Sequence, residues 1–150
     1  MTCALVARRD AGAAPPWDRI VRTDHWDVVH AFGTALEGWL VLVVRRHITS
    51  VADLADAEAD ALGPLLKRVS AALQEVVGCD KTYIAQFAEH PDHPHVHVHV
   101  IPRPRDLSDE QQGPRVFSLL GVGEDGAVPE ARMDAIAAQI AVLLGSSDPA

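Results

Sequence analysis

The segment 95–101, which reads HVHVHVI, constrains the fold more than any other part of the chain. Histidine and valine alternate along it, and successive side chains of a β-strand point to opposite faces. The pattern therefore predicts a strand with His95, His97 and His99 on one face and valines on the other. A slip of one residue would turn every histidine into the core, so the alternation also specifies the register.

Periodicity elsewhere predicts the remaining elements. Four further strands are expected at residues 19–23, 26–32, 39–45 and 81–87. Apolar residues spaced three or four positions apart predict a long helix around residues 62–77 and a C-terminal helix around 133–144. Successive strands with one helix among them indicate an α+β fold with a mainly antiparallel five-stranded sheet.

A few residues predict where these elements begin and end. Ser50 precedes the long helix as a start signal, and Gly78 is a stop signal. Pro64 lies inside the helical pattern and predicts a kink or a break. Pro102 and Pro104 are expected to end the histidine strand. The segments expected to form loops are residues 11–17 and 105–128.

Composition limits the classes of partner. With 150 residues the chain has the length of one domain, which we expect to span residues 1–150. A formal net charge of −8 disfavours nucleic acid and membrane surfaces as partners, so an anionic substrate needs a local binding site. Two cysteines are too few for a disulfide framework, and no apolar run could cross a bilayer. These features favour a soluble cytoplasmic protein.

Three interpretations of the histidine face compete. It is a solvent-facing polar surface, a metal site or a catalytic strand. His-x-His is a zinc-binding arrangement, and His90, Asp92 or His93 would be the further ligands. Alternatively, a neutral imidazole attacks phosphorus without help from a base, while its neighbours donate to the phosphoryl oxygens.

The segment HVHVHVI resembles the signature of the histidine triad (HIT) superfamily, His-φ-His-φ-His-φ-φ with φ apolar. The resemblance covers residues 20–103 and includes the glycine-led segment GWLVLVVRRHITSV, a helix, a strand like KTYIAQFAE and a Pro-Arg exit. It implies a HIT-like fold with a motif core at about 20–105 and a C-terminal extension at 106–150. It also implies a homodimer that acts on a nucleotide-like small molecule.

Carried over by position, the resemblance assigns roles to the three histidines. His97 is the expected nucleophile, His99 the contact to the α-phosphate and leaving group, and His95 the residue that orients the centre. We therefore expect a phosphoramidate or dinucleoside polyphosphate hydrolase or transferase that forms a covalent nucleotidyl-histidine. No cofactor and no metal are expected. The alternatives are a non-catalytic nucleotide-binding sensor and a zinc-dependent hydrolase.

The chain departs from the family pattern around this strand. It has Gly38-Trp39 where many members have Gly-His, and an indole donates one hydrogen bond but accepts none. Trp39 is therefore expected to pack the site or stack on a base, and it cannot relay hydrogen bonds as imidazole does. The other substrate-binding candidates are Phe32 for the base, Gln86 for a phosphate oxygen and Arg103 for steering phosphate to the site.

Overall fold

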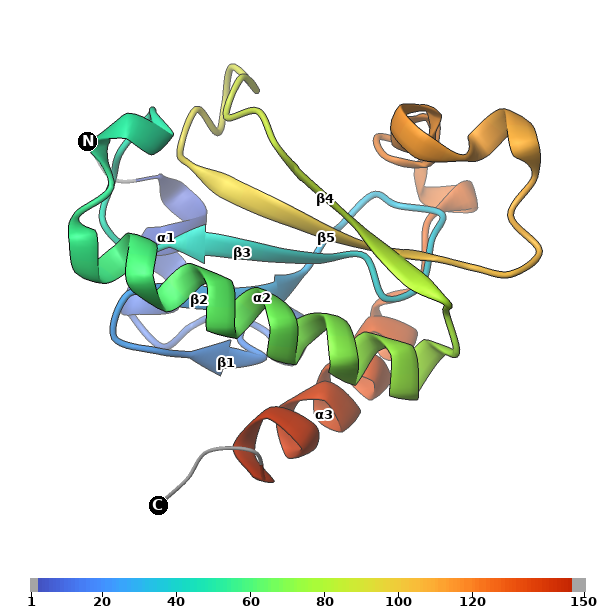
Figure 1. Ribbon diagram of the computed structural model, residues 1–150, viewed down its shortest axis with the longest axis horizontal. Coiled ribbons are helices and arrows are strands. Elements are labelled where there is room, and N and C mark those ends of the chain that lie inside the picture. The colour runs from blue at the N-terminus through green and yellow to red at the C-terminus, as the bar shows by residue number, and fades with distance from the viewer. Residues whose placement is uncertain (1–2, 147–150) are drawn as a thin grey trace.

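The computed structural model describes residues 3–146 and has one five-stranded antiparallel sheet (Figure 1). The order of strands across the sheet is β1-β2-β3-β5-β4. The strands are β1 (Val21–Arg22), β2 (Trp26–His30), β3 (Leu40–Val44), β4 (Lys81–Gln86) and β5 (His97–Arg103). The predicted α+β class and the antiparallel sheet are therefore confirmed.

The valine face of β5 packs on the long helix α2 (Asp56–Val77). In the β3–β5 register, Val98 lies opposite Leu42 of β3. Both side chains belong to the larger of two buried clusters. Leu73 of α2 is in the same cluster and is fully buried. A fully buried aliphatic side chain contributes about 1.5–3 kcal/mol, so this face holds β5 in one register. The C-terminal helix α3 (Glu130–Ser146) packs against α2 and adds Ile136 and Ile140 to the cluster.

Helix α2 corrects one expectation and refines another. It runs through Pro64 without interruption, so the predicted break is wrong. Apolar packing by residues such as Leu65 and Val69 outweighs the hydrogen bond that proline cannot donate. Ser50 caps a 3₁₀ turn, Val51–Asp53, rather than α2 itself. No helix within residues 3–146 is both long and apolar enough to span a membrane.

The histidine face of the sheet is covered by segments whose structure was not predicted. A short helix, α1 (Ala4–Asp10), places Val6 in the second buried cluster beside Val41 and Val43 of β3. The segment Gly113–Leu119 forms 3₁₀ turns and adds Val116 to the same cluster. Seven residues are too few to show helical periodicity, so α1 could not be predicted from the sequence.

The histidine strand begins and ends later than predicted. His95 precedes β5, and β5 continues through Pro102 to Arg103. The pairing of β5 with β3 ends at Val100, so proline occupies a position where that ladder has already stopped. The expectation that Pro102 and Pro104 end the strand is therefore wrong for Pro102, whereas Pro104 directly follows the last strand residue, Arg103.

Gly38, which precedes β3, is expected to be intolerant of a side chain. Its φ is +84°, and an added Cβ would lie 2.9 Å from Val77 Cγ1. Gly38→Ala should lose about 1–2 kcal/mol from the left-handed backbone and roughly 1–3 kcal/mol from overpacking. Gly78, with φ +72° and open space around it, is the matched control for the backbone effect alone. Urea denaturation measures both, and equal losses would contradict the steric argument.

Candidate active site on the histidine face

The histidine face opens into a cavity of about 720 Å³. Its walls come from α1, the end of β2, residues 87–93 and residues 117–122. His95, His97 and His99 all line it, together with aromatic side chains from three separate segments, Phe32, Phe87 and Phe117. A largely apolar cavity with a few convergent polar groups is typical of small-molecule sites.

His97 is the most accessible histidine of the three. Its Nδ1 lies 2.7 Å from the main-chain oxygen of His95. A carbonyl oxygen only accepts, so Nδ1 of His97 must carry the proton. In the neutral ring, Nε2 then keeps its lone pair and has the electronic state of a nucleophile.

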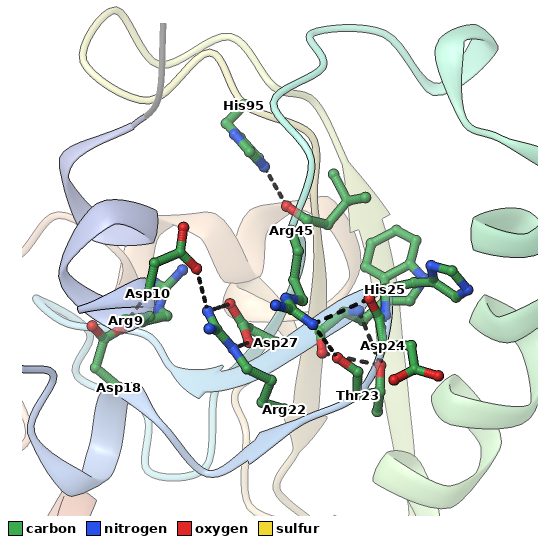
Figure 2. Close-up of polar contacts among 12 residues, drawn as sticks. Arg9, Asp10, Asp18, Arg22, Thr23, Asp24, His25, Asp27, Arg45 and His95 are labelled. Atoms are coloured by element: carbon green, nitrogen blue, oxygen red, sulfur yellow. Dashed lines mark hydrogen bonds and ion pairs between the residues drawn. The ribbon is translucent and has the colours of Figure 1, made fainter. Parts of the chain in front are cut away.

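His95 is buried and held from two sides. Its Nε2–H donates to the main-chain oxygen of Val44 on β3, shown by the dashed line in Figure 2. Its Nδ1 lies 3.0 Å from Nδ1 of His47, and therefore accepts from that ring. Burial is the main cause that lowers the pKa of His95, so the ring stays neutral. These contacts fix the backbone oxygen to which His97 donates.

His99 is oriented by Trp39. The indole Nε1–H donates to Nδ1 of His99 at 3.0 Å, and the rings meet edge to face with centroids 5.8 Å apart. Because an indole nitrogen only donates, Nδ1 of His99 is the acceptor and Nε2 carries the proton. Burial lowers the pKa of His99 to about 4, which favours the neutral ring by roughly 3 kcal/mol. His99 is thus a neutral N–H donor beside His97, whose ring centroid is 5.0 Å away.

Of the two roles expected for Trp39, the structure has packing of the site and not stacking on a base. The side chain is 0% exposed and cannot stack on a nucleotide base. Trp39 instead donates a hydrogen bond to His99 from beneath the cavity. An indole cannot relay a proton, but its single donor is enough to select one tautomer of the histidine that it contacts.

Two other predicted substrate contacts lie away from the cavity. Gln86 is opposite Val98 in the β4–β5 register, so it shares the α2 face and not the histidine face. Arg103 ends β5 opposite Lys81, and neither Gln86 nor Arg103 lines the cavity. Phe32 does line it and is 52% exposed.

Some cavity residues were missed by the sequence analysis. Arg9 comes from α1, His30 from the end of β2, and Phe117 from the segment expected to be a loop. Phe117 packs edge to face on both Trp39 and His99. None of these residues lies in a motif, and only the folded chain brings them to β5.

The histidines do not form a metal centre in the described structure. Within residues 3–146 no three His, Cys, Asp or Glu side chains are arranged to hold a metal ion. The potential ligands contact one another only in pairs. His47 contacts His95, and Cys3 contacts His93, with Sγ 3.4 Å from Nδ1. The residues present therefore do not fit a zinc site, which needs four ligands or three and a water molecule.

Trp39→Phe is expected to release the tautomer of His99 while keeping an aromatic ring in the core. In the wild type, ¹⁵N NMR of the imidazole should show the proton of His99 on Nε2, with titration near pH 4. In the variant both tautomers should be populated, since Nδ1 has lost its donor. Trp26→Phe is the matched control, because Trp26 is equally buried but donates to the main-chain oxygen of Glu58. An unchanged His99 spectrum in Trp39→Phe would contradict this role.

The comparisons with known proteins agree with the geometry. The HIT domain family model matches residues 16–106, more than half of the chain, while a search of curated proteins finds no match.

A histidine triad protein from Bradyrhizobium japonicum is 25% identical, with a TM-score of 0.66 over 81% of this chain and 86% of its own. A zinc-bound histidine triad family protein from Mycobacterium smegmatis is 19% identical, with a TM-score of 0.65 over 99% of both chains. A hypothetical histidine triad nucleotide-binding protein from Sulfolobus tokodaii is 12% identical, with a TM-score of 0.71 over 96% of this chain and 93% of its own. The chain belongs to the HIT domain family and has its fold.

Proposed function

We propose that the protein is a nucleotide hydrolase or nucleotidyl transferase in which His97 attacks the α-phosphorus of a phosphoramidate or a dinucleoside polyphosphate. The observation that carries the proposal is the hydrogen bond from Nδ1 of His97 to the main-chain oxygen of His95, which leaves Nε2 with a lone pair. Family membership supports the nucleotide as the ligand class.

The reaction has two displacements at phosphorus. In the first, Nε2 of His97 forms a bond to the α-phosphorus while the bond to the leaving group breaks. In the second, water forms a bond to phosphorus and the bond to Nε2 breaks, which releases a nucleoside monophosphate. One proton of the water ends on the leaving group, and the imidazole of His97 returns to its neutral form. In a transfer reaction, another hydroxyl or phosphate replaces the water.

The neighbours of His97 stabilise the charges that develop in these steps. Once Nε2 is bonded to phosphorus, the ring becomes cationic and its Nδ1–H bond to the His95 oxygen strengthens. Nε2–H of His99 donates to a phosphoryl oxygen or to the leaving group. His99 remains neutral near pH 7 because burial lowers its pKa to about 4.

The apolar part of the cavity suits a nucleobase. Phe32 and Phe87 are largely exposed at the cavity, and Phe117 packs against Phe87 with ring centroids 5.3 Å apart. Exposed aromatic faces beside the reacting histidine favour stacking of a flat ring. In this proposal Phe32 and Phe87 contact the base, while His97 and His99 contact the phosphate.

The cellular setting of this activity is proposed from the same features. Cys3 and Cys79 are free thiols, as expected in a reducing compartment. The net charge of −8 gives no general attraction to nucleic acid or to anionic membranes. We therefore propose a cytoplasmic enzyme with a small-molecule substrate.

His97→Gln should reduce turnover by roughly 10³-fold or more, because the covalent route is lost. Its fold should remain intact, since the side chain faces the cavity. The assay uses adenosine 5′-phosphoramidate and diadenosine tetraphosphate, and rapid quenching of the wild type should trap a nucleotidyl adduct on the peptide that contains His97. His25→Gln, in the turn between β1 and β2, is the control and should keep full activity.

Other outcomes of this experiment separate the alternatives. Near-full activity in folded His97→Gln would refute the nucleophile, and loss of that activity with a chelator would favour a zinc hydrolase. Nucleotide binding by the wild type without turnover of either substrate would favour a non-catalytic sensor.

We also propose a homodimer formed through β4. This strand ends the sheet, so its outer edge has no partner strand within residues 3–146, and Ile84 on it is 48% exposed. An unpaired edge with an apolar side chain is a template for pairing with another chain. Light scattering should return twice 16.1 kDa for the wild type. Ile84→Glu should shift the mass towards the monomer, and Val51→Glu, at a residue 47% exposed on a 3₁₀ turn, should not. A monomeric wild type would remove the proposal.

A further inference from the structure

The cavity contains a guanidinium that the mechanism above does not use. Among the described residues that line the cavity, Arg9 is the only lysine or arginine. It lies in the last turn of α1, and its side chain is 5% exposed. The same cavity is lined by the carboxylates of Glu89 and Asp92, which repel a polyphosphate.

An ion pair holds Arg9 in place. Its Nε and Nη2 lie 3.1 and 2.9 Å from Oδ1 of Asp18, which is itself 1% exposed. Figure 2 shows the two side chains facing each other. Arg8 shares the same carboxylate through Oδ2 at 2.6 Å. Two guanidinium groups on one carboxylate leave one net positive charge at the cavity wall.

Within residues 3–146, two donors of this cluster have no acceptor, Nε of Arg8 and Nη1 of Arg9, and of the two residues only Arg9 lines the cavity. Nη1 of Arg9 is buried and has no hydrogen-bond partner among residues 3–146. A buried donor of a charged group without a partner is costly, and an anionic oxygen bound in the cavity would relieve that cost. Burial is the main cause that lowers the pKa of His93 and His95, and the charge of Arg9 adds to the lowering in both. The positive charge of Arg9 therefore acts on both His93 and His95.

We propose that Arg9 binds an anionic oxygen of the leaving group and so selects nucleotidyl substrates whose leaving group is a phosphate chain over those that release an amine. This inference rests on the proposed function and names its substrate class. The α-phosphate is already met by His97 and His99 on β5, whereas Arg9 approaches from α1, another wall of the cavity. In a protein with a net charge of −8, such a local cation is what a polyphosphate requires.

The test is the ratio of kcat/KM for diadenosine tetraphosphate to that for adenosine 5′-phosphoramidate. Arg9→Gln should lower this ratio by at least about tenfold, the factor expected when a hydrogen bond between charged groups is lost. Because the single change leaves Asp18 buried with one partner fewer, Arg9→Gln/Asp18→Asn is made in parallel, which keeps the net charge of the cluster at that of the wild type. Arg8→Gln is the comparison variant, since it removes the same unit of charge from the shared Asp18 at a residue that does not line the cavity, and its ratio should fall less than that of Arg9→Gln.

Calorimetric binding of tripolyphosphate separates this inference from the proposed function. The wild type should bind it at least about ten times more tightly than Arg9→Gln, and the loss in Arg8→Gln should be smaller because the cavity contact is kept. If neither nucleotide is turned over but tripolyphosphate binding still depends on Arg9, the proposed function fails and the anion site stands. Equal losses on both substrates in Arg9→Gln would place Arg9 on the α-phosphate and overturn the substrate class. No loss in either measurement would overturn the site itself.

Discussion

The pairing of β5 with β3 is the interaction on which the site depends. Val98 and Val100 lie opposite Leu42 and Leu40, and this apolar face is sealed by α2. A shift by one residue would exchange the two faces of β5 and bury imidazoles among aliphatic side chains, at a cost of several kcal/mol. The apolar core therefore determines which side chains of β5 reach the cavity.

A backbone acceptor and a side-chain donor then determine which nitrogen carries the proton in His97 and in His99. The carbonyl of His95 fixes the proton of His97 on Nδ1, and the indole of Trp39 fixes that of His99 on Nε2. Burial keeps His95 and His99 neutral by lowering their pKa values. Adjacent histidines on one strand thereby acquire opposite functions, an acceptor at His97 and a donor at His99. The substitution of tryptophan for the histidine common in the family preserves this division, because one donor suffices for it.

Two walls of the cavity differ in chemical character. Phe32 and Phe87 offer aromatic surface, and α1 brings the Arg9–Asp18 pair. A protein with a net charge of −8 has no general field for phosphate, so its affinity for anions must come from such a pair. The short helix α1 is held by this ion pair and by burial of Val6, which couples the folding of the N-terminal segment to the completion of the site.

The sequence by itself determined the elements whose periodicity is local: the alternation at 95–101, the stripe at 62–77 and the stop at Gly78. It also placed His97 and His99 on one face, because a strand has a period of two. Only the tertiary structure decided the rest. Gln86 and Arg103 are near the triad in sequence, but neither lines the cavity. Gln86 lies opposite Val98 on the other face, and Arg103 is at the far end of β5. Arg9, Phe117 and the contact of Trp39 with His99 come from segments far apart in the chain, and such contacts leave no periodic signal in a sequence.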